Sequence, residues 1–433
     1  MTRKVILVVI DGLTPAMLEG ALERLPTLGA LAEVGTLARA TTTFPSLTPV
    51  CLSTIATGAH GDVHEIPHLV WWHRQEQRIV EYGSSFGAAR KAGLTQTLRD
   101  TLVGMNAEHL GRNATTIFET LADQGLRTAA VNFTAYRGRT LHRSFLRPLG
   151  TVLGPEHFFF YNLFETAKTG APLSWRNRPA GTIDRYATAA ARWLVTRDDF
   201  DFLLFYLSDY DYASHAAGPD AAHDVLLRCD AAIGELVDAA GGLGPFLERY
   251  AILVVADHGQ SHVREVADLR RVYASEPGTL LVASNRAAAV YRLDDSAPPV
   301  RTLATVVERE PSAEVVVFRE GDAVVVRRQG EEASLTVRDG ALEVGGAASI
   351  LDQPDAIART WAAAHCPNAG EVIVSATEGW EFVDMGGKAH HGGGSHGSLD
   401  AADSVVPVLG VGLDPPRRLA ELAPAIRRHF DVP

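Results

Sequence analysis

The chain has 433 residues, and its 52 acidic and 40 basic side chains give a formal net charge of −12. Because nucleic-acid-binding faces are built from clustered positive charge, this balance argues against a nucleic-acid-binding face. Hydrophobic residues make up 46% of the chain and charged residues 21%, a composition typical of a folded globular protein. No apolar run is long enough to cross a bilayer.

The chain opens with a short apolar run. Val5–Ile10 leads directly into Asp11-Gly12 without a small-residue cleavage site, which predicts a buried parallel strand and not a secretory signal. Only three cysteines occur, too few and too scattered for a disulfide framework. We therefore expect a reducing compartment and a cytoplasmic location.

Short apolar runs and helical patterns then alternate along the chain. We expect strands at Val5–Ile10, Thr128–Phe133, Phe202–Leu207, Ala251–Ala256, Val372–Ser375 and Val405–Gly410. We expect helices at Thr48–Thr57, Ile117–Gln124, Ile183–Thr196, Ala221–Ala240 and Asp355–His365. This alternation predicts an α/β fold, with a mostly parallel sheet sandwiched by helices. Ligands of such folds collect beyond the carboxyl ends of the strands.

Two stretches depart from this alternation. From about Leu280 to Ala348, short runs with period-two patterning and turn residues between them predict a small antiparallel β-rich insert. We therefore divide the chain into a discontinuous catalytic core, residues 1–270 and 350–433, and an insert, residues 271–349. Residues 137–180 form a candidate lid segment, because long irregular loops are often functional; an apolar plug around Phe158–Phe164 is the alternative.

Acidic, histidine and threonine side chains lie where the predicted strands end and where one helix begins. They are Asp11, Thr48, Asp211, His215, Asp257, His258 and His396. Each alone has an ordinary explanation, since aspartate often caps turns and threonine before proline caps helices. Together they would converge on one sheet edge, where carboxylates need cations to offset their repulsion. Aspartate and neutral histidine are ligand types that zinc and similar divalent ions accept.

These motifs resemble those of the alkaline phosphatase superfamily, and most closely its type I phosphodiesterase/nucleotide pyrophosphatase branch. The resemblance rests on Asp11-Gly12, on Phe44-Pro45-Ser46-Leu47-Thr48 with Thr57-Gly58, on DYASHAAGP from Asp211 to Pro219, on Asp257-His258-Gly259 and on His396-Gly397. The motifs follow the order of that family and span nearly the whole chain. The resemblance implies an alkaline phosphatase-like core.

The resemblance also implies two divalent metal ions, Zn²⁺ by ligand type with Mn²⁺ as the alternative. Asp211, His215 and His396 would hold one ion, and Asp11, Asp257 and His258 the other, with Thr48 completing its coordination. Thr48 would be the catalytic nucleophile, forming a phospho-threonine that water then hydrolyses.

The implied function is hydrolysis of a small-molecule phosphodiester or nucleotide pyrophosphate. A phosphomonoesterase or phosphonate hydrolase of the same superfamily is the first alternative, and a metal-containing binding module without turnover is the second. The sequence gives no indication of the oligomeric state.

Candidate substrate contacts follow from position and residue type. The resemblance implies an asparagine that binds a phosphate oxygen after the nucleophile, and this chain instead has Cys51 one helical turn after Thr48. A thiol is a weak donor, so a small buried side chain is the alternative for Cys51. Asn132 and Arg137 follow a predicted strand, and Trp72 follows the nucleophile helix. Each could contact substrate, with a packed or solvated side chain as the alternative.

Overall fold

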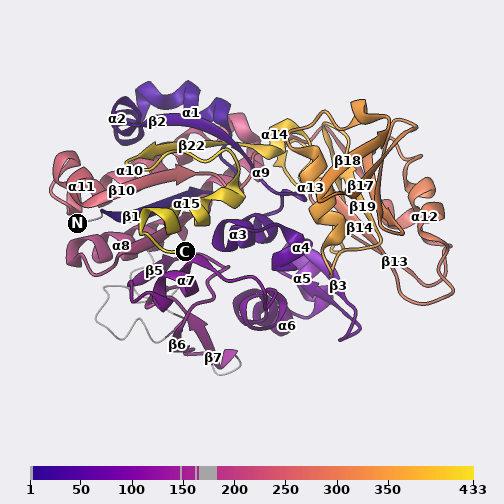
Figure 1. Ribbon diagram of the computed structural model, residues 1–433, viewed down its shortest axis with the longest axis horizontal. Helices are drawn as coiled ribbons and strands as arrows, with labels where there is room; N and C mark the ends of the chain where they lie inside the picture. The colour runs from indigo at the N-terminus through magenta and orange to yellow at the C-terminus, as the bar shows by residue number, and fades with distance from the viewer. Residues whose placement is uncertain (1–2, 147–148, 161–162, 165–182) are drawn as a thin grey trace.

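The structure is a computed structural model that describes residues 3–146, 149–160, 163–164 and 183–433. Two seven-stranded sheets dominate it, each with helices packed against it (Figure 1). The first sheet is mostly parallel and the second is antiparallel. The α/β fold predicted from the sequence, with an additional antiparallel β-rich part, is therefore confirmed.

The first sheet has the strand order β2-β22-β10-β1-β9-β5-β8, and its strands stack from β2 near the top of Figure 1 down to β5. Their bounds are β1 Lys4–Ile10, β2 Thr36–Thr41, β5 Thr128–Val131, β8 His157–Phe159, β9 Phe202–Leu207, β10 Tyr250–Val255 and β22 Val405–Val411. Strands β10, β1, β9, β5 and β8 run parallel, and β22 pairs antiparallel to β10 and β2. Strands β9 and β10 are buried along their whole length, which explains their continuous apolar sequences.

Helices cover this sheet in two packed groups. One group contains α2, α8 and α10, and the other contains α3, α7 and α15. Their bounds are α2 Pro26–Val34, α3 Thr48–Thr57, α7 Ile117–Asp123, α8 Ile183–Arg197, α10 His223–Ala239 and α15 Leu422–His429. The predicted helices agree with the observed ones to within two residues at each end, the usual scatter of helix boundaries.

The second sheet has the strand order β13-β14-β19-β15-β16-β17-β18. Its strands are β13 Thr279–Ser284, β14 Ala287–Arg292, β15 Ala313–Glu320, β16 Ala323–Arg328, β17 Glu331–Arg338, β18 Ala341–Gly346 and β19 Val372–Ala376. Val315 and Val317 of β15 pack in one apolar cluster with helix α13 (Ala356–His365). Val316 and Phe318 pack in another with α12 (Val300–Val307). Alternate residues of β15 therefore face opposite sides of the sheet, and both sides are buried along the middle of this strand.

The sequence-based division placed residues 350–433 in the core, and the structure differs from it at helix α13, which packs on the second sheet, and at one strand. Strand β19 lies in the middle of the second sheet, between β14 and β15. A five-residue apolar strand fits the interior of either sheet, and only its pairing partners decide between them. The second sheet is thus drawn from two separate stretches of the chain.

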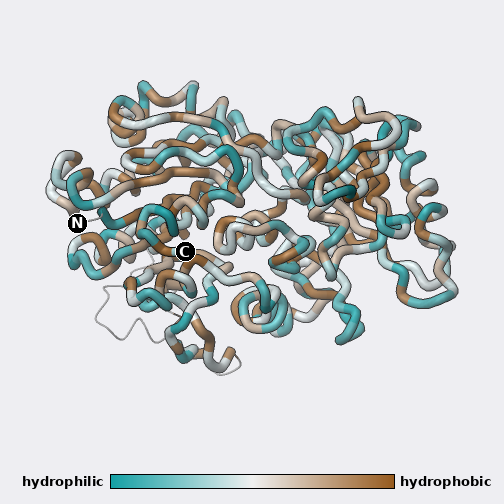
Figure 2. The backbone as a smooth tube through the Cα atoms, in the orientation of Figure 1, coloured by the Kyte–Doolittle hydropathy of each residue, from teal (hydrophilic) through white to brown (hydrophobic). Residues whose placement is uncertain are grey.

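The two sheets share apolar packing. Ala287 and Tyr291 of β14 belong to the same buried cluster as Val70 and Trp71 of β3 (Val70–His73) and the strands of the first sheet. Figure 2 shows hydrophobic residues along the strands of both sheets and hydrophilic residues on the outer helices and turns. No helix in the described part of the chain is long and apolar enough to span a membrane.

The candidate lid, residues 137–180, is only partly covered by the structure. Residues 147–148, 161–162 and 165–180 lie outside the described residues. The described part contains a hairpin of β6 (Thr140–Arg143) and β7 (Thr151–Gly154), followed by β8. Phe158 and Phe159 of β8 are buried in the first core, as the apolar-plug alternative expects.

We expect Leu253→Ala to destabilise the protein strongly, because Leu253 is fully buried in the central strand β10. Deleting a buried leucine side chain costs about 2–5 kcal/mol of unfolding free energy. Leu227→Ala is the matched control, since Leu227 is exposed on α10 and its loss should change the unfolding free energy by less than about 0.5 kcal/mol. Chemical denaturation of both variants measures the difference, and equal midpoints would contradict the assigned core.

Candidate active site

The site lies at the carboxyl ends of three neighbouring parallel strands, β10, β1 and β9. Asp11 directly follows β1, and Asp257 and His258 follow β10 after one residue. Helix α9 (Asp209–Ala217) follows β9 and carries Asp211 and His215 one turn apart, on one helix face. Since parallel strands end at the same sheet edge, these side chains are brought together although they are far apart in sequence.

The first candidate metal group contains Asp11, Asp257 and His258, whose ligand atoms all lie within 4.8 Å of one another. His258 Nε2 is 3.2 Å from Asp11 Oδ1 and 3.5 Å from Asp257 Oδ2. All three residues are buried, and these two carboxylate oxygens have no hydrogen-bond partner among the described residues. A buried, unpartnered carboxylate oxygen is costly, so the group fits a bound cation.

The electrostatics of this group also favour a cation. Burial raises the pKa of Asp11 well above its ordinary value, and the nearby Asp211 carboxylate raises it further. Burial likewise raises the pKa of Asp257, with a further contribution from Asp11. Carboxyl groups in such surroundings hold either a proton or a metal ion, because the bare anions repel one another in a medium that screens them poorly.

The second candidate metal group contains Asp211, His215 and His396, again with ligand atoms within 4.8 Å. His215 Nε2 lies 3.2 Å from Asp211 Oδ2, and His396 Nε2 lies 3.8 Å from Asp211 Oδ1. Burial opposes protonation of His215, but the adjacent Asp211 carboxylate raises its pKa to about 9. Burial lowers the pKa of His396, so this imidazole is the neutral form that ligates metals.

Backbone carbonyl groups orient all three histidine rings. Nδ1 of His215 lies 2.7 Å from the Gly394 carbonyl oxygen, and Nδ1 of His396 lies 2.8 Å from that of Ser46. Nδ1 of His258 is 3.0 Å from the carbonyl oxygen of the following residue. A ring that donates from Nδ1 leaves the Nε2 lone pair free for a metal ion, which is the usual second-sphere arrangement of metal-binding histidines.

The two candidate metal groups lie side by side. The rings of His258 and His396 stack with centroids 3.5 Å apart and an interplanar angle of 8°. Gln260 donates from Nε2 to Asp211 and accepts a 2.5 Å hydrogen bond from Ser214 Oγ. Tyr206 donates its hydroxyl hydrogen bond to Asp11. Neither Gln260 nor Tyr206 was predicted from the sequence, although Gln260 lies two residues after the Asp257-His258 motif.

Thr48 is the first residue of helix α3, with Leu47 as the N-cap. Thr48 therefore lies inside the helix and is not its N-cap, so the ordinary capping explanation does not describe it. Thr48 Oγ1 instead lies 3.1 Å from His258 Nε2, at the edge of the first metal group. The dipole of the ten-residue helix makes its start a favourable place for an anion.

A cavity of about 580 Å³ opens over both groups, a volume that suits a small ligand. Its polar lining includes Asp11, Thr48, Asp211, His215 and His396. Its apolar and aromatic walls come from Leu52, Leu69, Tyr82, Met105, Phe160 and Tyr212.

Asn132 is the one predicted substrate contact that lines this cavity. It follows β5 in a left-handed conformation, with φ of 60°, and its backbone N–H donates to the Phe159 carbonyl oxygen at 2.8 Å. Asparagine tolerates this conformation better than most residues, which lets the chain turn and leave the amide in the cavity.

The other three residues predicted as substrate contacts have other partners in the structure. Cys51 lies on the buried face of α3, where its Sγ accepts a 3.3 Å hydrogen bond from Thr42, and burial raises the pKa of its thiol. Arg137 binds the Glu119 carboxylate at 3.1 Å and several backbone carbonyl oxygens. Trp72 packs against the hydrophobic core. None of the three lines the cavity, because each is occupied by packing or by hydrogen bonds elsewhere.

The cavity is also lined by residues that were not predicted as site residues. Lys388, His390 and His391 belong to one glycine-rich loop, and Asn285 comes from the second sheet. His390 stacks on His215 with ring centroids 4.1 Å apart, and its Nδ1 lies 2.7 Å from Glu381 Oε1. The two histidines lie a few residues before His396 in the sequence, and this proximity is a signal that could have found them. No local pattern indicates Asn285, which reaches the site only through the packing of the two sheets.

Comparisons with solved structures agree with this architecture. Murine ectonucleotide pyrophosphatase/phosphodiesterase 5, as an inactive threonine-to-alanine variant in complex with AMP, matches with a TM-score of 0.65 and 15% identity over 100% of this chain and 96% of that chain. Phosphonoacetate hydrolase from Sinorhizobium meliloti 1021, in complex with phosphonoformate, matches with a TM-score of 0.65 and 17% identity over 99% and 96%. At such identities these matches show a shared fold.

The human ectonucleotide pyrophosphatase/phosphodiesterase 5 matches with a TM-score of 0.65 and 14% identity over 100% of this chain and 96% of that chain. No curated protein sequence matches this chain significantly. A family model described as type I phosphodiesterase/nucleotide pyrophosphatase matches residues 5–399, which contain every residue of both candidate metal groups. The chain therefore belongs to the type I phosphodiesterase/nucleotide pyrophosphatase family of phosphoester hydrolases.

Proposed function

We propose that this protein is a two-metal hydrolase of phosphodiesters or nucleotide pyrophosphates that uses Thr48 as its nucleophile. The observation that carries the proposal is the position of Thr48 Oγ1, at the start of α3 and 3.1 Å from His258 Nε2. This hydroxyl borders a buried group whose carboxylate oxygens lack partners among the described residues. The murine structural neighbour is inactive as a threonine-to-alanine variant and is in complex with AMP, which supports a threonine nucleophile.

Asp11, Asp257 and His258, completed by Thr48, would hold one divalent ion, and Asp211, His215 and His396 would hold the other. Their oxygen and nitrogen donors suit Zn²⁺, and Mn²⁺ is the alternative where its availability is higher. When bound, such ions supply positive charge that favours the alkoxide of the threonine and neutralises the phosphoryl oxygens.

The residues of the chain then have separate roles in the reaction. Thr48 Oγ1 gives up its proton and attacks phosphorus, the bond from phosphorus to the leaving oxygen breaks, and that oxygen takes up a proton as the alcohol or phosphate leaves. This step leaves a phospho-threonine. A water molecule next attacks phosphorus and breaks its bond to Oγ1. The water oxygen stays on the released phosphate product, and a proton restores the Thr48 hydroxyl. The N-terminus of α3 favours the anionic phosphoryl group. The Tyr206 hydroxyl and the Gln260 amide hold Asp11 and Asp211 in position.

A phosphonate hydrolase is the second candidate function, and one observation favours it. Lys388 and His391, on the glycine-rich loop, line the cavity beside the metal groups and could pair with a second anionic group of a small substrate. The structural neighbour from Sinorhizobium meliloti is a phosphonoacetate hydrolase, which makes this class of substrate worth testing.

The cytoplasmic location stays a prediction; the three cysteines on which it rests are buried and unpaired.

We expect Thr48→Ala to lower kcat on bis-p-nitrophenyl phosphate by at least about 1,000-fold, since the attacking oxygen is removed. Metal content, measured by elemental analysis, should stay at the wild-type value because the two groups keep their carboxylate and imidazole ligands. Thr196→Ala, at an exposed position late in α8, is the control and should retain wild-type rates. Unchanged turnover in Thr48→Ala would refute the assignment of the nucleophile.

Metal content should fall as the pH falls. The raised pKa values of Asp11 and Asp257 mean that protons compete for the ligand oxygens at a higher pH than at exposed carboxylates, so affinity for the ion weakens on acidification. Equilibrium dialysis against Zn²⁺ between about pH 8 and pH 5 measures this loss. Asp11→Asn should retain about one of the two ions at pH 8; two retained ions would contradict the ligand assignment.

Substrate preference separates the two candidate functions. A diesterase should hydrolyse bis-p-nitrophenyl phosphate with a higher kcat/KM than p-nitrophenyl phosphate, because the cavity offers apolar walls for the second ester group. Faster turnover of phosphonoacetate, measured as released phosphate, than of either ester, measured as released p-nitrophenol, would support the phosphonate hydrolase instead. A protein that binds both ions but converts none of the three compounds would contradict the proposed activity.

A further inference from the structure

The second sheet reaches into the cavity at one residue. Asn285 lies at the turn between β13 and β14, is only 7% exposed, and lines the cavity together with Thr48 and His396. Its backbone is left-handed, with φ of 56°, a conformation that asparagine tolerates and that directs the hairpin tip into the site. Asn285 is therefore the one site residue that the second sheet supplies among those described.

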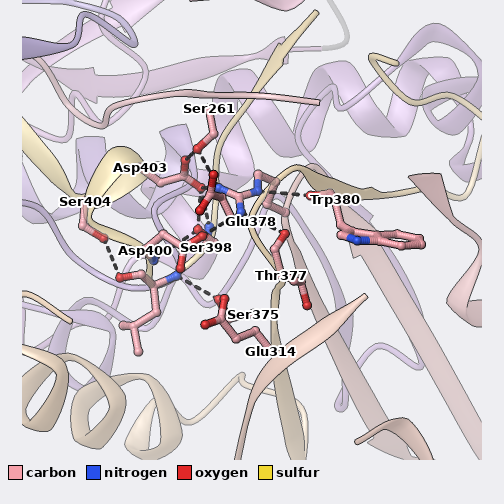
Figure 3. Close-up of polar contacts among 12 residues, drawn as sticks. Ser261, Glu314, Ser375, Thr377, Glu378, Trp380, Ser398, Asp400, Asp403 and Ser404 are labelled. Atoms are coloured by element: carbon pink, nitrogen blue, oxygen red, sulfur yellow. Dashed lines mark hydrogen bonds and ion pairs between the residues drawn. The ribbon is translucent and has the colours of Figure 1, made fainter. Parts of the chain in front are cut away.

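The neighbouring residue fixes the hairpin tip in place. Arg286 is fully buried, and its guanidinium binds the carboxylates of Asp400 at 2.7 Å and Asp403 at 2.8 Å. It also donates to Ser261 Oγ at 2.7 Å, and Figure 3 shows Ser261 and Asp403 pointing toward each other in this network. The Arg286 N–H donates to the His396 carbonyl oxygen at 2.8 Å. Charge-assisted bonds of this kind hold Asn285 rigidly beside the candidate ligand His396.

The hydrogen bond from Asn285 to His396 can exist only while His396 binds no metal ion. His396 Nδ1 donates to the Ser46 carbonyl oxygen, so Nε2 carries the lone pair, and Asn285 Nδ2 lies 2.9 Å from it as the donor. An ion held by His396 Nε2 would use this lone pair. The amide of Asn285 would then be an unpaired donor facing the cavity, which is costly unless a ligand accepts its hydrogen bond.

We infer that Asn285 Nδ2 donates a hydrogen bond to a non-bridging oxygen of the substrate phosphoryl group. The inference rests on the proposed function, since it requires the metal-loaded site and a phosphoryl ligand next to Thr48. It gives the chain a phosphate-binding amide that comes from the second sheet and not from the nucleophile helix, where Cys51 is buried. A preorganised donor of this kind strengthens as negative charge builds up on the phosphoryl oxygens.

Asn285→Gly tests the inference, because glycine removes the amide and suits the left-handed backbone. We expect kcat/KM on bis-p-nitrophenyl phosphate to fall about 100-fold, mostly through kcat. The affinity of the zinc-loaded protein for inorganic phosphate, measured by calorimetry, should fall about 10-fold. Asn285→Asp, which replaces the donor with an anion, should lose more on both counts. Asn113→Gly, at an exposed position, is the matched control and should retain wild-type values.

Zinc affinity separates substrate contact from simple support of His396. The inference expects Asn285→Gly to bind zinc as tightly as the wild type, or more tightly, because the amide competes for the same lone pair. Weaker zinc binding in this variant would overturn the inference, and so would wild-type kinetics with wild-type phosphate affinity. If the wild-type protein hydrolyses no ester, the proposed function fails, while the comparison of phosphate affinities still decides for or against Asn285.

Discussion

Three buried aspartates at one sheet edge are the constraint on which the rest of the site depends. Asp11, Asp211 and Asp257 follow adjacent strands, and their mutual repulsion adds to the cost of burying them. The protein offsets part of this cost with its own donors: Asp257 accepts from two backbone N–H groups, at 3.0 and 3.2 Å, and Asp11 accepts from a tyrosine hydroxyl. The oxygens left without partners are those that face His258, so a bound cation would offset the remaining negative charge.

The two sheets meet at this constraint. The short strands β11 (Ser261–His262) and β21 (Gly394–Ser395) pair antiparallel and connect the segment after His258 to the segment before His396. The buried Arg286 then ties the second sheet to the same region through two carboxylates. Removing one partner from such a buried ionic network is strongly destabilising. The network therefore fixes the position of the β-rich part of the chain relative to the site.

The shared fold does not by itself decide the substrate. The similar solved structures include an ectonucleotide pyrophosphatase/phosphodiesterase and a phosphonoacetate hydrolase, all at 14–17% identity to this chain. Function in such a fold is set by the residues around the common site. In this protein those residues come from separate segments, including Leu52 and Tyr82 on the apolar wall and Lys388 on the glycine-rich loop.

The sequence alone determined the α/β class, the approximate bounds of the main helices and strands, and the six residues that the structure gathers into two candidate metal groups, with Thr48 beside the first of them. Such features are local: an apolar run reads as a buried strand, and a strand end places the next side chain at the sheet edge. Tertiary structure alone decided that β19 joins the second sheet, that Cys51, Trp72 and Arg137 turn away from the cavity, and that Asn285 enters it. Each of these depends on which distant surfaces pack together, and no pattern within a short window of sequence encodes that choice.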